Sequence, residues 1–127
     1  MTHRFDPSQG LIIVPARLFG PSNDAIVRLA LDTGATSTLI NTEITVFLGY
    51  DPATSTDRIQ VTTGSGVEFC PRVAMKRIDA LGRSMNNFPV LCHSLPPTSQ
   101  VDGLLGLDCF RDSKLSIDLT NGVITIT

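Results

Sequence analysis

The sequence of 127 residues lacks any hydrophobic run long enough to cross a membrane, which takes about 18 residues. The longest candidate, Leu11 to Val14, is stopped by Pro15. The first residues also lack the apolar segment of a secretory signal peptide. From these absences we expect a chain that is not exported and that carries no membrane segment; the cytoplasm suits both, and the sequence names no other compartment.

Cysteine and charge are also scarce. Cys70, Cys92 and Cys109 form no CxxC pair and leave an odd number, which argues against a disulfide framework. The two histidines, His3 and His93, lie far apart in the sequence, so we expect no zinc site. Nor do we expect any other metal or a cofactor. Charged residues make up 17% of the chain, and no block of Lys or Arg is present, so nucleic acid is not an expected partner.

What the sequence does contain is the pattern of one β-rich domain. A chain of 127 residues, 42% hydrophobic, has the size and apolar content of a single domain, so residues 1–127 are interpreted as one. Short apolar runs separated by turn residues predict a chain made mostly of strands, with little helix. The strands are expected within residues 11–18, 25–31, 38–40, 58–62, 67–70, 73–81, 87–92, 101–106, 115–119 and 123–127.

Two short helices are expected among these strands. Residues 41–48 predict one or two helical turns, with Ile44, Phe47 and Leu48 on one face. Residues 107–111 predict a second short helix.

Small and polar residues predict the turns of three hairpins. The tip around Gly64 separates two alternating runs and predicts a hairpin that projects into solvent. Gly82-Arg83-Ser84 predicts a second turn. Asn121-Gly122 suits a type I′ turn, in which both central residues have positive φ.

The segment Leu31-Asp32-Thr33-Gly34-Ala35 places a carboxylate directly after an apolar strand. The Thr33 hydroxyl can bond main-chain groups and fix the loop. Gly34 has no side chain to block an approach to the carboxylate, so its N–H can donate to Asp32. Asp-Thr-Gly alone is also ordinary turn composition, so its context decides the interpretation.

In context, residues 29–37 resemble the active-site segment of the aspartic proteases, specifically the retroviral-type, retropepsin-like family. Residues 102–108 resemble the family's second signature, in which Leu104 and Leu105 are followed by Gly106. The predicted hairpin around Gly64 lies between the two signatures, where the family has its flap. The terminal hairpin lies where the family builds its dimer sheet, so the resemblance covers most of the chain.

The resemblance implies an all-β fold: a closed β-barrel of the acid-protease type, with a flap hairpin, one short helix and one lobe per chain. The family uses two such aspartates, and this chain has only one Asp-Thr-Gly. The resemblance therefore implies a homodimer, in which the two copies of Asp32 activate a water that cleaves a polypeptide substrate. It also implies that Thr33 interlocks across the dimer, and that Gly34 lines the cleft beside Ala35. The residues expected to close over the substrate as a flap are Thr62, Thr63, Gly64, Ser65 and Gly66.

The sequence departs from the retroviral pattern at Leu107, where those enzymes carry an Arg that braces the dimer, so this interface must be held differently. Asp108 is interpreted as a cap or structural anchor. Cys92 and His93 do not suggest a thiol nucleophile, because neighbouring residues of a strand point to opposite faces. Neither Ser37 nor Ser65 has a histidine placed for a Ser-His-Asp triad.

Two alternatives to a homodimeric endopeptidase remain at this stage. The chain can be a catalytically silent dimerisation or peptide-binding module with the same fold. It can also be active only within a longer protein whose flanking segments control dimerisation. The intact Asp32-Thr33-Gly34 favours the enzyme, because a silent module has no strong need for both Thr33 and Gly34 beside Asp32.

Overall fold

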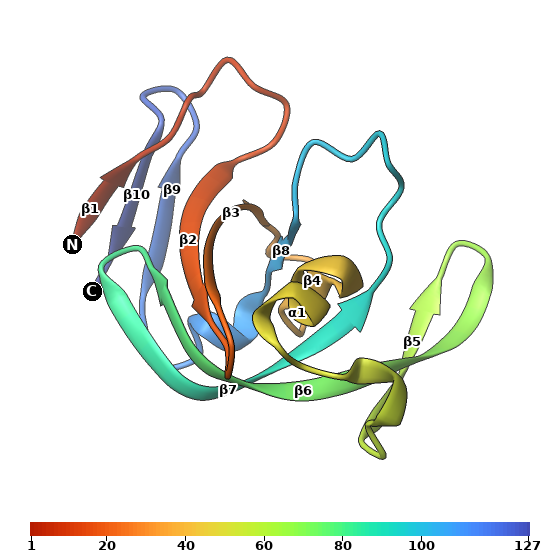
Figure 1. Cartoon of the computed structure of the whole chain (residues 1–127). Coiled ribbons are helices and arrows are strands. Elements are labelled where there is room, and N and C mark those ends of the chain that lie inside the picture. The colour runs from red at the N-terminus through yellow and green to blue at the C-terminus, as the bar shows by residue number, and fades with distance from the viewer.

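The computed structural model describes the backbone of residues 1–127 and every side chain except that of Thr63, so the expected flap role of that side chain lies outside the described residues. Six strands close into a barrel (Figure 1), in the order β2-β3-β8-β4-β7-β6, and the pairing of β2 with β6 completes the circle. The expected closed barrel, with one lobe in the chain, is therefore present. The barrel strands are β2 (Ile13–Phe19), β3 (Asp24–Leu31), β4 (Leu39–Asn41), β6 (Gly66–Ala80), β7 (Arg83–His93) and β8 (Gly103–Leu105).

The short strand β8 holds the centre of the barrel together. It runs parallel to β3, with Leu105 opposite Leu31, and antiparallel to β4, with Leu104 opposite Leu39. At its first residue, Gly103, a Cβ atom would lie only 2.2 Å from the Leu39 carbonyl oxygen. The glycine therefore permits a strand contact that a side chain would block.

The seventh strand of the large sheet, β5 (Arg58–Thr63), pairs only with the first part of β6, from Gly66 to Pro71. This β5–β6 hairpin projects away from the barrel, on the right of Figure 1, and we call it the flap. It follows a short 3₁₀ helix, η1 (Pro52–Thr54).

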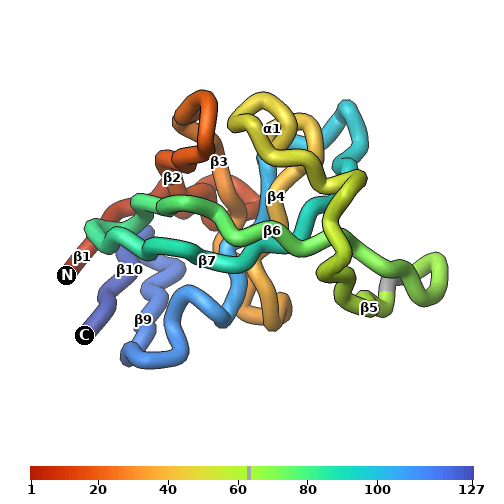
Figure 2. The backbone as a smooth tube through the Cα atoms, turned by 60° about the horizontal axis from the view of Figure 1, so that its bottom comes forward, coloured from red at the N-terminus to blue at the C-terminus, as the bar shows by residue number. Residues whose placement is uncertain are grey.

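A separate three-stranded sheet joins the two ends of the chain. Its order is β1-β10-β9, from β1 (Thr2–Arg4), β9 (Leu115–Asp118) and β10 (Val123–Ile126). The two termini lie side by side at this sheet, on the side of the molecule opposite the flap (Figures 1 and 2). The hairpin of β9 and β10 was expected, whereas β1 was not, because three polar or charged residues carry no apolar periodicity.

The helix α1 (Thr42–Leu48) begins at the Asn41 cap, whose side chain accepts the Glu43 N–H. Leu48 is fully buried, but Phe47 is 56% exposed, so the expected single apolar face of this helix is wrong at Phe47. The segment after β8 is the 3₁₀ helix η2 (Leu107–Cys109), shorter than the expected 107–111. Among the residues described, no helix is long and apolar enough to span a bilayer.

Two expected strands are one, because β6 runs without a break from Gly66 through Pro71 to Ala80. Arg83 and Ser84 also belong to β7, so the turn before it is Leu81-Gly82, with φ of 52° and 71°. This is the turn with two positive φ values. Leu81 accepts that backbone because its side chain is buried in the core.

The type I′ prediction at Asn121-Gly122 is wrong, since only Gly122 has a positive φ. The Asp118 carboxylate accepts the backbone N–H groups of Thr120 and Asn121 and the Asn121 side-chain amide. These bonds stabilise a four-residue loop, from Leu119 to Gly122, in place of a two-residue turn.

Candidate active site

Asp32 lies at the end of β3, where the chain leaves the barrel. Its backbone N–H donates to the Leu105 carbonyl (3.0 Å), so β8 fixes the residue through the main chain. The Gly34 N–H donates to Asp32 Oδ1 at 2.8 Å. A Cβ on residue 34 would lie 3.2 Å from that oxygen, which is tighter than most contacts and shows why glycine suits this position. The expected hydrogen bond between Gly34 and Asp32 is therefore present.

Gly106 and the residue after it, Leu107, contact the backbone of the loop from Thr33 to Ser37. The Leu107 N–H donates to the Ala35 carbonyl at 2.8 Å. A Cβ on Gly106 would lie 2.7 Å from the Ser37 carbonyl carbon and 2.9 Å from the Ala35 oxygen. Gly106 therefore lets the two segments touch along their backbones.

Thr38 is a structural residue of the site that sequence reasoning missed. Its side chain is fully buried, and its hydroxyl donates to Asp108 Oδ1 (2.7 Å) and accepts the Gly106 N–H (3.1 Å). Its backbone N–H donates to Asp108 Oδ2 at 2.9 Å. Asp108 is thus a structural anchor, and it caps the β3–β4 loop, not its own helix. The only local signal was a polar residue at the start of an apolar strand.

Cys109 lies beside this network, and its thiol is expected to be unreactive. Its Sγ is 3.2 Å from the Thr38 hydroxyl, and burial raises the pKa of the thiol to about 12. A thiol that stays protonated is a poor nucleophile, so Cys109 is a packing residue.

A cleft of about 340 Å³ opens between the Asp32 loop and the flap. Aliphatic and polar residues share the wall, and Asp32 is its only carboxylate among the described residues. The cleft is lined by Asp32, Gly34, Ala35, Thr36, Ser37, Leu39, Ile59, Gln60, Val61, Thr62, Leu91 and Leu104.

The structure brings together only some of the residues expected to form the site. Asp32, Gly34, Ala35, Thr62 and Leu104 line the cleft. Leu105 is buried in the core, and Gly106 packs against the backbone of the loop that follows Asp32.

The remaining expected residues lie outside the wall of the cleft in a single chain. Thr33 is exposed, and no described residue of its own chain hydrogen-bonds to its side chain. At the flap tip, Gly64, Ser65 and Gly66 do not line the cleft. A Cβ on Gly64 would meet nothing within 4 Å, so the tip is not packed against the barrel there.

A second surface hollow, of about 410 Å³, lies against β2 and the β6–β7 turn and contains a different carboxylate, Asp79. This carboxylate is bound to Arg77 (2.6 Å) and to the Ser84 hydroxyl (2.7 Å). These hydrogen bonds, of which the one from Arg77 has the largest effect, lower the pKa of Asp79 from 3.8 to about 2. Because Asp79 is committed to these partners, Asp32 is the better candidate for chemistry.

The Asp79 contacts predict a pH-dependent part of the stability. The folded pKa (about 2) lies below the ordinary value of 3.8, so the stabilisation is complete above about pH 4 and disappears as the pH falls through about 2. Asp79→Asn should flatten the fall in melting temperature over this range. The effect should be small because the pair is solvent-exposed. Equal pH slopes for the two proteins, measured by thermal unfolding, would contradict this assignment.

Comparison with known proteins agrees with this arrangement. Residues 14–109 match the family described as aspartyl protease. A retropepsin-like aspartic protease from Rickettsia conorii has a similar structure, with a TM-score of 0.73 and 17% identity over 99% of this chain and 88% of that one. The retroviral protease-like domain of Ddi1 from Leishmania major has a TM-score of 0.59 and 22% identity, over 94% and 90% of the two chains. No curated protein matches by sequence. At these identities the solved structures establish the likeness of fold alone.

Proposed function

Since the chain belongs to the aspartyl protease family, we propose that it is an aspartic endopeptidase that acts as a homodimer, with residues 1–127 as one catalytic domain. The observation that carries the proposal is the cleft, where Asp32 is the single carboxylate among the described lining residues and is oriented by the Gly34 N–H. The chemistry of the family needs two carboxylates. Among the described residues that line this cleft, one chain supplies one.

A two-fold dimer would supply the second carboxylate as Asp32 of the other copy. Two carboxylates within hydrogen-bond reach cannot both ionise cheaply, so the pair holds one proton. The ionised member takes a proton from a bound water, which attacks the peptide carbonyl. The protonated member donates to the carbonyl oxygen and stabilises the tetrahedral intermediate.

Several features of the single chain suit such a dimer. Thr33 is exposed beside Asp32, so its hydroxyl is free to bond the matching loop of a second copy. Within the described strands, β1 and β9 each pair on one side only, which leaves open edges to which a second copy can add strands. These contacts would replace the brace that retroviral enzymes obtain from Arg at the position of Leu107.

The flap would close on an extended peptide. Ile59 and Val61 on β5 face Leu39, Leu91 and Leu104 across the cleft. An extended segment whose side chains beside the cleaved bond are apolar would fit between these walls. Closure of the hairpin would exclude water from the reacting groups.

The direct test is cleavage of an unfolded protein between about pH 3 and pH 7, the range in which a carboxylate pair can hold one proton. A statine-type mimic of the tetrahedral intermediate should block the reaction. Cleavage that the mimic leaves untouched would contradict an aspartic mechanism. Absence of cleavage at every pH in a protein shown to be dimeric would favour the peptide-binding module.

A shared site also predicts that activity depends on protein concentration. Below the dimer dissociation constant, each tenfold dilution should lower the activity per chain by up to about tenfold, because the fraction of dimer follows mass action. The measurement is a dilution series of initial rates beside sedimentation at the same concentrations. Activity per chain that stays constant where sedimentation shows only monomer would contradict the homodimer.

A further inference from the structure

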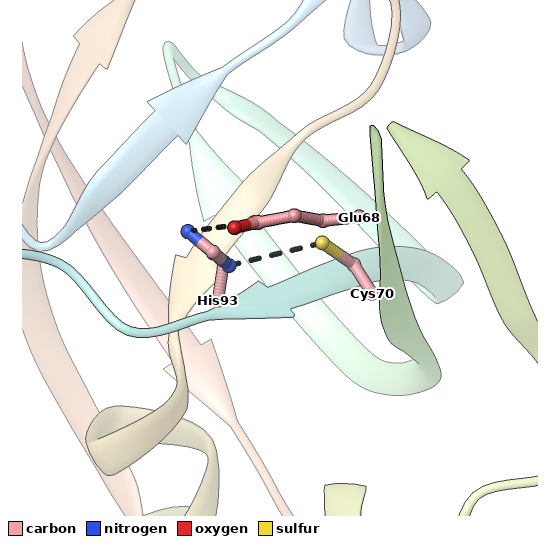
Figure 3. Close-up of side chains that lie close together, drawn as sticks. All are labelled: Glu68, Cys70 and His93. Carbon is pink, nitrogen blue, oxygen red and sulfur yellow. Dashed lines mark hydrogen bonds and ion pairs between the residues drawn. The ribbon is translucent and has the colours of Figure 1, made fainter. Parts of the chain in front are cut away.

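Three metal-binding side chains meet where the flap leaves the barrel. Glu68 and Cys70 lie on β6, and His93 is the last residue of β7. One donor atom from each, a carboxylate oxygen, a thiol sulfur and an imidazole nitrogen, can be chosen so that all lie within 4.8 Å of one another. Figure 3 shows the carboxylate and the thiol directed at the two nitrogens of the His93 ring, with separations of 3.6 Å (Nε2) and 3.8 Å (Nδ1).

The cluster follows from the strand register. The last paired residues of β6 and β7 are Arg72 and Leu91, so two residues further on Cys70 and His93 face each other. Glu68 is two residues from Cys70, on the same side of the strand. Sequence reasoning excluded a metal by comparing the two histidines, and it missed a set whose members are brought together only by the pairing of β6 with β7.

Thiol, imidazole and carboxylate together have a limited set of uses. A nucleophilic cysteine would need an accessible thiolate, but Cys70 is only 3% exposed. Burial, and then the Glu68 charge, raise the pKa of Cys70, which further disfavours a nucleophile. The same three donors are a ligand set for Zn²⁺, which takes Cys, His and Glu in tetrahedral sites and can keep a water in the fourth position.

We propose that Glu68, Cys70 and His93 form a binding site for a thiophilic divalent cation of the Zn²⁺ class. Ligand atoms around tetrahedral zinc lie about 3.5 Å apart, so the cluster needs to tighten by roughly 1 Å at its widest. Glu68 can supply that movement, because its side chain is 45% exposed and long. The His93 side chain is 39% exposed, which leaves a path for the ion from solvent.

The position of the site gives the ion a consequence for the flap. Cys70 pairs with Ile59 and Glu68 pairs with Val61, so these side chains share one face of the hairpin. Ile59 and Val61 line the cleft. An ion held by β6 on one side and by β7 on the other would extend the attachment between these strands past Arg72. It would therefore restrain the flap near its base, an effect that matters for catalysis only if the proposed peptidase function holds.

The test uses the full chain and Co²⁺, which replaces Zn²⁺ and shows a near-ultraviolet charge-transfer band when a thiolate binds it. We expect one Co²⁺ per chain, a thiolate band, and displacement of the ion by Zn²⁺. His93→Gln and Glu68→Gln should weaken binding by more than the ~10–100-fold typical of outer-shell partners. Both residues are partly exposed, so these variants should fold even if Cys70→Ser does not.

The chain offers matched controls for the thiol and the imidazole ligands. Cys92→Ala removes the thiol that precedes His93 in the sequence; this thiol is buried and shares a hydrogen bond with the Thr45 side chain. His3→Gln removes the other histidine of the chain. Neither should change the Co²⁺ band. A missing band in the wild type, a band that survives His93→Gln unchanged, or a band that disappears in Cys92→Ala would each overturn the site.

Asp32→Asn should bind Co²⁺ like the wild type, which separates this site from the active-site carboxylates. Zn²⁺ should also slow amide hydrogen exchange in residues 58–70 of the wild type and not in His93→Gln. Equal exchange with and without bound Zn²⁺ would overturn the restraint on the flap. These readouts need no peptidase activity, so their failure leaves the proposed function intact, and a chain without activity can still confirm the site.

Discussion

Asp32→Asn should lower peptidase activity by at least ~10³-fold, because in a homodimer one substitution changes both catalytic carboxylates at once. The variant keeps an oxygen that can accept the Gly34 N–H, so the loop geometry of the wild type (2.8 Å) should be preserved. What it loses is the pair that shares one proton, and with it the base that activates water. The measurement is the initial rate of cleavage at the optimum pH, beside the melting temperature.

Asp24→Asn is the matched control. Asp24 is an exposed carboxylate at the start of β3, the strand that leads to Asp32; it is paired with Arg17 at 2.7 Å and does not line the cleft. It should keep wild-type activity and change stability by no more than about 1 kcal/mol. If Asp32→Asn retained activity while folding normally, the assignment of Asp32 would be wrong. If it lost activity only together with its fold, the result would say nothing specific to the carboxylate, which is why the melting temperature is measured alongside.

The part of the site that was predictable is the part encoded by neighbouring residues. Asp32 follows an apolar strand, and Gly34 is two residues later, so their hydrogen bond depends on local geometry alone. The second signature was also predictable as a unit, because Leu104, Leu105 and Gly106 are contiguous. The barrel followed from the number and order of the short apolar runs together with the family resemblance.

The part that was not predictable depends on residues far apart in sequence. Thr38 and Asp108 are 70 positions apart, and their contact exists only because β8 inserts between β3 and β4. Cys70 and His93 meet through the register of β6 and β7, which a slip of one residue would destroy. No periodicity within either segment carries that information.

The turns show the same limit at short range. Asn121-Gly122 has the better composition for a type I′ turn, yet the two positive φ values occur at Leu81-Gly82. At the first site the Asp118 carboxylate stabilises a longer loop. At the second, burial of Leu81 offsets the cost of a backbone that leucine rarely adopts. A local side-chain contact therefore overrode the turn composition at the first site, and burial in the core did so at the second.

Gly103→Ala should destabilise the fold by about 3 kcal/mol or more, the upper end of the range for overpacked cores. The added Cβ would lie 2.2 Å from the Leu39 carbonyl oxygen and 3.1 Å from Ile40 Cα, both of them backbone atoms. These atoms cannot rotate away, because β4 is also paired with β7 through Leu39 and Ile40. For a domain of this size we expect the melting temperature to fall by about 10 °C or more.

Gly10→Ala is the control for this prediction, since a Cβ there meets nothing within 4 Å, and it should melt within about 2 °C of the wild type. A melting temperature for Gly103→Ala equal to that of the control would mean that β8 does not lie as close to β4 as described. The same substitution tests how Asp32 is held, because the Asp32 N–H is bonded to Leu105, two residues along the strand. If β8 positions the carboxylate, the folded fraction of Gly103→Ala at low temperature should cleave more slowly per dimer than wild type, whereas Gly10→Ala should not. Full activity in that folded fraction would show that the loop holds Asp32 without support from β8.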